Sequence, residues 1–102
     1  MIIYVDIDDT ICTTNGLDYS TARPIREAIE KVNKLYSEGN EIVYWTARGT
    51  VTGIDWRELT EEQLEEWGAL YTRLELGKPA YDLFIDDKNI NSKDWLEGKT
   101  EY

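Results

Sequence analysis

Short apolar runs alternate with amphipathic stretches along the 102-residue chain. The apolar runs predict four buried strands, at residues 2–6, 42–45, 70–76 and 81–85. Strands that alternate with helices are typical of α/β domains with a small, mostly parallel sheet. Right-handed connections between parallel strands would place helices on both faces of that sheet. The pattern therefore predicts a single three-layer α/β domain spanning residues 1–102.

The stretches between the strands predict three helices. The first begins at Pro24 and ends at Gly39, because apolar side chains recur along one helical face and a glycine follows them. The second begins with a capping box at residues 60–63, and a short third helix follows Ser92. Residues 11–23 contain Thr, Asn and Gly in a cluster and predict a loop.

Composition narrows the classes of function. The formal net charge is −10, from 11 basic and 21 acidic residues, and such a surface repels nucleic-acid backbones and anionic lipid. We therefore expect neither nucleic acid nor membrane as a partner. No apolar run is long enough to cross a bilayer, and no secretory signal is evident at the N-terminus. The single cysteine, Cys12, permits no internal disulfide, so a cytoplasmic location is the expectation.

Polar side chains gather where the predicted strands end. Asp6 and Asp8 are spaced i, i+2 and would point to the same side while the strand stays extended. In open parallel sheets, ligands bind outside the carboxyl ends of the strands. The side chains expected to converge there are Asp6, Asp8, Thr46, Asp86 and Asp87, which follow predicted strands, and Lys78, which precedes a predicted strand by a short turn.

Four clustered carboxylates call for a cation. Two unit charges about 4 Å apart repel by about 4 kcal/mol at an effective dielectric constant of about 20, which a marginally stable domain does not easily tolerate. The chain has no histidine and one cysteine, which excludes a zinc site of usual composition. Oxygen ligands alone favour a hard cation, and we expect Mg²⁺.

These motifs resemble those of the haloacid dehalogenase (HAD) superfamily of phosphohydrolases. Asp-x-Asp-x-Thr at residues 6–10, Thr46 after an apolar strand, Lys78, and Asp86-Asp87 after another apolar strand follow in the order of the four motifs of that superfamily. The runs Trp45–Gly49, Gly77–Pro79 and Ile85–Lys88 are similar to small bacterial members. The resemblance implies a HAD-like Rossmannoid fold and a Mg²⁺-dependent phosphomonoester hydrolase.

The resemblance also implies a role for each motif residue. Asp6 would be the nucleophile that becomes an aspartyl phosphate, and Asp8 would be the general acid and base. Thr46 and Lys78 would contact the phosphoryl group. The residues expected to bind phosphate or substrate are Asp9, Thr10, Thr46, Ala47, Arg48 and Lys78. The expected metal ligands are Asp6, Asp8, Asp86 and Asp87.

The chain leaves no room for the cap domain that most members carry. Residues 11–23 could form at most a small flap, and residues 76–81 hold only a turn. We therefore expect a small sugar or polyol phosphate as substrate, with a homo-oligomer covering the open site. Two alternatives stay open: a non-catalytic module that binds Mg²⁺ and phosphate, and a phosphotransferase of the same superfamily. A phospho-acceptor receiver domain is disfavoured, because Thr46 stands where its acceptor should be.

Overall fold

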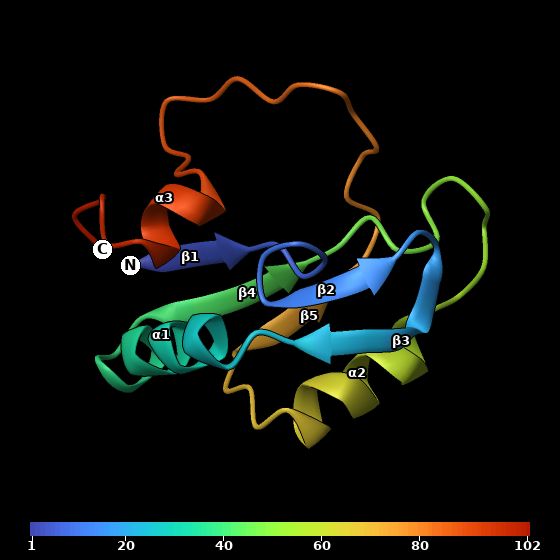
Figure 1. Cartoon of the computed structure of the whole chain (residues 1–102), viewed down its shortest axis with the longest axis horizontal. Helices are drawn as coiled ribbons and strands as arrows, with labels where there is room; N and C mark the ends of the chain where they lie inside the picture. Colours follow the sequence, from blue (N-terminus) through green and yellow to red (C-terminus); the bar gives the residue numbers. More distant parts are fainter.

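Three parallel strands form the centre of the molecule, and a separate hairpin lies at the end toward which they point (Figure 1). The computed structural model describes all residues from 1 to 102. The central strands are β1 (Ile2–Val5), β4 (Glu41–Trp45) and β5 (Arg73–Glu75), in the order β1-β4-β5. The hairpin pairs β2 (Cys12–Asn15) with β3 (Asp18–Pro24) in antiparallel fashion. A small, mostly parallel sheet is therefore confirmed.

Three helices accompany the sheet: α1 (Arg26–Ser37), α2 (Arg57–Glu66) and α3 (Ser92–Leu96). They contribute to one continuous core with the alternate residues of the strands that face them. That core has 13 buried members: Val5, Ile7, Ile11, Cys12, Ala28, Ile29, Val32, Ile42, Tyr44, Leu64, Trp67, Leu74 and Trp95. None of the three helices is long and apolar enough to span a bilayer.

Helices α1 and α2 share one face of the sheet, so the predicted arrangement with helices on both faces is not confirmed. The strand order β1-β4-β5 runs in one direction without reversal. Two right-handed crossovers that continue in the same direction place both connecting helices, α1 and α2, on the same face. The opposite face carries Tyr4 and Trp45, whose rings meet edge to face at 5.7 Å, and Tyr4 is exposed.

The fourth predicted strand is absent. Residues 81–85 have no regular structure, and every residue from 79 to 91 is exposed. The exposed fractions of Leu83 and Ile85 reach 75% and 86%. This segment links β5 to α3 by a wide excursion around the sheet, in orange in Figure 1, and β1 keeps an unpaired edge. An apolar run forms a strand only where it finds a partner strand, and here it has none.

Four other predictions about elements and their boundaries also differ from the structure. The stretch 11–23, expected to be a loop, contains most of the β2–β3 hairpin. Pro24 ends β3, and α1 begins two residues later. Helix α2 begins at Arg57, so Thr60 lies inside it and does not cap it; its hydroxyl instead donates to the Trp56 carbonyl at 2.7 Å. The strand expected at 70–76 shortens to 73–75.

The C-terminal end of α1 and the position of α3 agree with the sequence prediction. Helix α1 stops before Gly39, which adopts a left-handed φ of 97°, as a glycine C′ residue does. The short helix expected after Ser92 is present, and the Asn91 side chain caps it by accepting from the Lys93 amide at 2.9 Å.

Candidate active site

A tight turn follows β1 and presents Asp6 and Asp8. The Ile7 carbonyl accepts from the Thr10 and Ile11 amides, at 3.2 and 2.9 Å, and so folds the chain back on itself. Asp9 takes a left-handed φ of 61°, a conformation that Asp tolerates better than most residues. Because Ile7 is buried, the carboxylates on either side of it are held at the protein surface.

Asp6 is paired with Lys78. The Lys78 Nζ lies 3.4 Å from Asp6 Oδ2, and the Ile7 amide donates to Asp6 Oδ1 at 2.9 Å. Burial raises the pKa of Asp6 above its ordinary value, although the nearby Lys78 ammonium opposes that shift. The Asp6 side chain remains 39% exposed. It is thus an accessible carboxylate with a cation beside it.

Lys78 is held in place by its backbone and by aromatic rings. Its amide donates to the Thr46 carbonyl at 3.1 Å, and its own carbonyl accepts from the Thr50 hydroxyl at 2.8 Å. The Lys78 Nζ lies 5.6 Å from the ring centroid of Trp45 and 5.4 Å from that of Tyr81. The ends of β4 and β5 therefore bring Lys78 to Asp6, as the sequence predicted.

Asp8 is paired with Arg48. The Arg48 Nη2 donates to Asp8 Oδ1 at 2.8 Å, and its Nε donates to Asp8 Oδ2 at 3.0 Å. The Arg48 side chain is fully buried, whereas the Asp8 side chain is 22% exposed. Both oxygens of Asp8 thus face a guanidinium on one side while the carboxylate keeps access to solvent.

Further contacts satisfy the rest of the Arg48 guanidinium. Its Nη1 donates to Gln63 Oε1 at 2.6 Å and to Thr60 Oγ1 at 3.1 Å, and its Cζ lies 4.7 Å from the centroid of the Tyr19 ring. Gln63 in turn donates to the Tyr19 carbonyl at 2.7 Å. These partners belong to β3 and α2, so the predicted contact of Arg48 with phosphate is not the contact that the structure displays.

Thr46 lies between the two pairs. It is buried, and its Oγ1 accepts from the Arg48 amide at 3.1 Å. Gly49 then turns the chain with a φ of 84°, and a Cβ there would lie 2.1 Å from the Ile54 carbonyl oxygen. Only glycine fits this turn, which sets the direction of the Arg48 side chain.

Cys12 packs beside this network. Its thiol donates weakly to the Ile7 carbonyl, and burial, with the Asp8 carboxylate nearby, raises the pKa of Cys12 to about 12. A thiol with such a pKa stays protonated at neutral pH and is a poor nucleophile. Cys12 therefore acts as a small buried side chain.

Asp86 and Asp87 are not part of this arrangement. Asp86 Oδ2 accepts from the Lys88 amide at 3.3 Å, and Asp87 pairs with the exposed Lys88 side chain at 3.5 Å. No group of three or more acidic, histidine or cysteine side chains lies close enough to hold a metal ion. The predicted set of four metal ligands is thus not assembled, because the strand that should carry Asp86 to the sheet end is missing.

The remaining predicted residues line the same turns. Asp9 is exposed, and its amide donates to the Cys12 carbonyl at 2.8 Å. Thr10 is half-buried in the turn after Asp8, and Ala47 is half-buried between Thr46 and Arg48.

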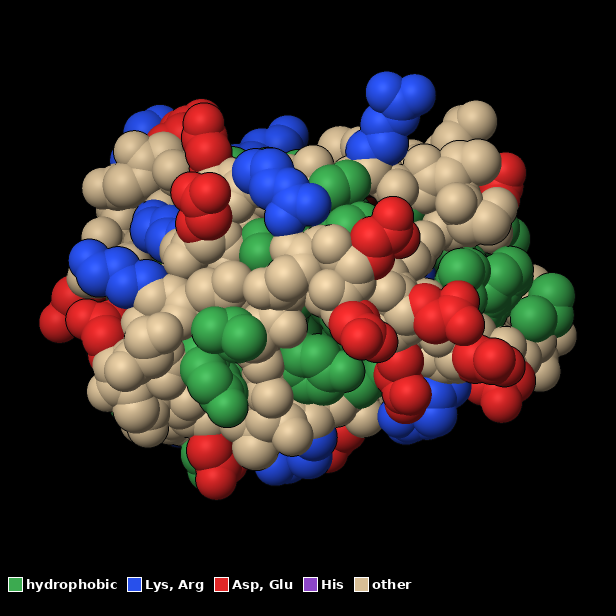
Figure 2. Space-filling model, turned by 90° about the horizontal axis from the view of Figure 1, so that it is seen from below, with side chains coloured by type: hydrophobic (Ala, Val, Ile, Leu, Met, Phe, Trp, Pro, Cys, Tyr) green, Lys and Arg blue, Asp and Glu red, His purple; other side chains and the backbone are tan.

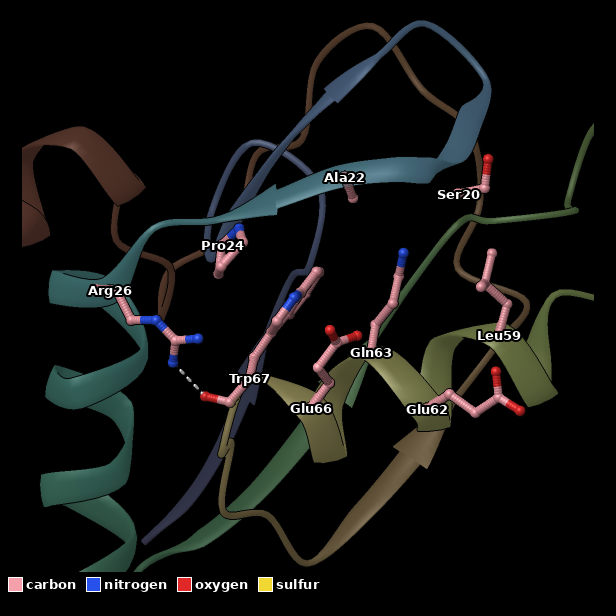
Figure 3. A pocket seen from close by; sticks show the side chains of 9 residues that line it. All are labelled: Ser20, Ala22, Pro24, Arg26, Leu59, Glu62, Gln63, Glu66 and Trp67. Atoms are coloured by element: carbon pink, nitrogen blue, oxygen red, sulfur yellow. Dashed lines mark hydrogen bonds between the residues drawn. The ribbon is translucent and has the colours of Figure 1, made fainter.

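A separate hollow of about 460 Å³ lies between β3, the start of α1, and α2 (Figure 3). Gln63, Glu62 and Glu66 line its α2 side, and the Arg26 guanidinium donates to the Trp67 carbonyl at 2.6 Å. Neither Asp6 nor Lys78 borders it. It adjoins the Arg48 network through Gln63 but does not contain the paired carboxylates.

Sequence reasoning missed the side chains that hold Arg48. Thr60 and Gln63 fall on the same helical face as Leu64 and Trp67, at i, i+3, i+4 and i+7. Polar residues on an otherwise apolar helix face require a buried partner. That pattern could have indicated that a charged side chain lies under α2.

Comparison with known proteins supports the fold. No protein-family model and no curated protein matches the chain. The crystal structure of a target protein from Vibrio cholerae is similar to it, with a TM-score of 0.85, 26% sequence identity, and coverage of 93% of this chain and 86% of that one. The chain thus shares its α/β architecture with an experimentally determined bacterial structure.

Proposed function

We propose that the protein is a phosphomonoester hydrolase in which Asp6 attacks phosphorus and forms an aspartyl phosphate. The observation that carries the proposal is the pair of Asp6 and Lys78, 3.4 Å apart at the carboxyl end of β1. A solvent-accessible carboxylate beside an ammonium can accept an anionic ester without leaving its charge unbalanced. The HAD-like order of motifs in the sequence agrees with this assignment.

The first step transfers the phosphoryl group to the protein. An oxygen of Asp6 forms a bond to phosphorus while the ester P–O bond breaks, and the leaving alcohol takes a proton from Asp8. The Lys78 ammonium neutralises charge on the phosphoryl oxygens. Thr46 positions the backbone of both cationic residues, because its carbonyl accepts from the Lys78 amide and its hydroxyl accepts from the Arg48 amide.

The second step releases phosphate. Water attacks phosphorus, the bond to Asp6 breaks, and Asp8 accepts the proton that the water loses. Both aspartates then return to their starting states. Positioning and charge neutralisation supply most of the rate in phosphoryl transfer, so few side chains are needed.

A magnesium requirement is a separate prediction, made from the sequence. Mg²⁺ would supply charge neutralisation at the phosphoryl group. The arrangement described above does not fit such a site: Asp6 and Asp8 are each paired with a cation, and Asp86 and Asp87 form no group with them. Neither step above depends on the metal.

We propose a small sugar or polyol phosphate as substrate and the cytoplasm as location. An excess of 10 negative charges disfavours polyanionic substrates such as nucleic acids. The β2–β3 hairpin occupies the residues predicted to form a small flap, and the Asp6 side chain is 39% exposed, so the site is open to small esters on its Asp6 side.

Phosphate release from a panel of simple phosphate esters tests the function. We expect turnover by the wild type and loss of about 10³-fold or more in D6N, since the nucleophile is removed. D82N, which changes an exposed carboxylate in the 79–91 segment, is the matched control and should keep wild-type turnover. A folded wild type that releases no phosphate from any ester, with or without Mg²⁺, would favour the non-catalytic alternative.

A further inference from the structure

We infer that Arg48 is a positioning residue: it fixes the direction of the Asp8 carboxylate and thereby its ability to protonate the leaving alcohol. The inference rests on the proposed function, because it gives Arg48 a role only if Asp8 is the general acid. It differs from the expectation that Arg48 binds phosphate.

The contacts of Arg48 exclude a direct role toward substrate. Its side chain is fully buried, and each of its three nitrogens donates to a protein group. Asp8 lies between Arg48 and solvent, because Asp8 is partly exposed and Arg48 is not. A guanidinium in that place reaches the reaction only through the carboxylate in front of it.

The two-point contact determines the orientation of Asp8. Arg48 Nη2 and Nε approach different oxygens of the carboxylate, at 2.8 and 3.0 Å, which fixes the plane of the group as well as its position. A lysine at the same place would keep the charge but offer no fork of fixed geometry. The R48K substitution can therefore separate the effect of the Asp8 orientation from the effect of the positive charge beside it.

Two other elements hold the guanidinium in its own orientation. Thr60 and Gln63 of α2 accept from Nη1, and the Tyr19 ring of β3 lies against its face. Gln63 also binds the backbone of Tyr19, which ties α2 to the hairpin. The direction of Asp8 is thus set by groups that come from the hairpin, from α2 and from the end of β4.

The dependence of rate on the leaving group provides the test. An alkyl phosphate needs its leaving oxygen protonated, whereas p-nitrophenyl phosphate leaves as a stable anion and needs little help from an acid. A misdirected Asp8 therefore slows the first step selectively for the alkyl ester, whereas its effect on the second step is the same for both esters. A general loss of folded structure slows both esters equally.

We expect R48K to lower kcat/KM, which reports the steps up to release of the alcohol, about 10-fold or more for glycerol phosphate and by less than about 3-fold for p-nitrophenyl phosphate. D8N should show the same selectivity, and adding R48K to D8N should lower the rate no further, since both act on one group. R23K is the matched control, because Arg23 lies exposed on β3, and it should behave as the wild type.

R48K tests orientation without removing the buried positive charge, because the lysine keeps that charge. Equal losses with both esters, or no loss with either, would overturn the inference while leaving the Asp6 nucleophile intact. A wild type without phosphatase activity would instead remove the proposed function itself.

Discussion

The Asp6 carboxylate is accessible to solvent, and it is harder to ionise than a carboxylate in water. Burial raises its pKa from the ordinary value of 3.8, and Lys78 only partly offsets this. Below pH 3.8 the group is protonated in both folded and unfolded chains and has no effect on stability. As pH rises through the folded pKa, ionisation costs the folded state more than the unfolded one. The same site that makes Asp6 available for reaction thus destabilises the protein at neutral pH.

We therefore predict that D6N melts at a higher temperature than the wild type at neutral pH. The difference should shrink toward zero as pH falls below the ordinary carboxyl pKa. Thermal unfolding followed by circular dichroism at several pH values measures it, with D82N as the exposed control. A D6N protein that is less stable than the wild type at pH 7 would mean that the Lys78 ion pair outweighs desolvation.

Gly49 occupies a position that has no room for a side chain. Its φ is 84°, and a Cβ would meet the Ile54 carbonyl oxygen at 2.1 Å. Gly53 has a similar φ of 76° but nothing within 4 Å of an added Cβ. G53A should cost about 1–2 kcal/mol of unfolding free energy, the usual penalty of a left-handed L-residue. G49A should cost more, because its overlap with backbone adds to that penalty and displaces Arg48.

Denaturant unfolding of the two glycine variants measures the difference directly. The pair is matched in residue type, in conformation and in loop. Equal losses of stability would show that the close approach of Gly49 to Ile54 does not exist in solution.

The 79–91 segment is the element on which sequence and structure disagree most. The apolar run at 81–85 predicts a buried strand, yet Leu83 is exposed in the structure. L83A should therefore change the unfolding free energy by less than about 0.5 kcal/mol, as surface substitutions do. L64A, which removes a fully buried side chain of α2, should cost about 2–5 kcal/mol. A loss of unfolding free energy in L83A as large as that in L64A would indicate that Leu83 is buried, as the predicted strand requires.

The elements that were predicted correctly depend on local signals. The strands at 2–5 and 41–45 are short apolar runs, and Gly39 ends α1 because glycine alone adopts the left-handed φ without cost. The 81–85 run carries an equally strong local signal but lacks a partner, and no local pattern reveals whether a sheet edge is available. Local propensity was overridden there by the arrangement of the whole chain.

Some contacts of the candidate site were predictable from the sequence, and others depend on the packing of the whole chain. Asp6 and Lys78 meet because Asp6 follows β1 and Lys78 follows β5 in one parallel sheet. The sequence predicted that the two side chains converge, but it placed Lys78 just before the strand at 81–85, which is absent. Arg48 finds its partners far along the chain, with Asp8 separated from it by 40 residues and Gln63 by 15. Such pairings depend on how β3 and α2 pack over the sheet, so motif spacing assigned Arg48 to substrate instead.

The distribution of charge is uneven over the whole molecule. Acidic side chains gather on the part of the surface over α2, while apolar patches lie between the charged groups elsewhere on that face (Figure 2). Helix α2 contains five glutamates, including Glu62 and Glu66 of the hollow in Figure 3. This surface repels polyanions, which agrees with a small monoester as substrate.

The face of the sheet opposite α1 and α2 bears on assembly. Ile2 and Tyr4 are exposed there because α1 and α2 share the other face. We expect a homo-oligomer, as the absence of a cap domain led us to predict. Size-exclusion chromatography with light scattering should give a mass above that of one chain. A strict monomer at all concentrations would contradict this expectation.

Magnesium binding is testable without any assay of activity. If the sequence motifs build a metal site, millimolar Mg²⁺ should raise the melting temperature of the wild type, because a ligand of the folded state alone stabilises it. The shift should vanish in D86N. R23Q changes a residue outside the predicted metal site and is the control, which should keep the shift. An unchanged melting curve would agree with the separation of Asp86 from Asp6 in the structure.

The most direct test of the Asp6 assignment is to trap the phosphorylated protein. Borohydride added during turnover reduces an aspartyl phosphate to homoserine, and peptide mass spectrometry then locates the modified position. We predict homoserine at position 6 in the wild type and none in D6N. Phosphate release without any modification at Asp6, or with modification at Asp8 or Asp86 instead, would contradict the central claim.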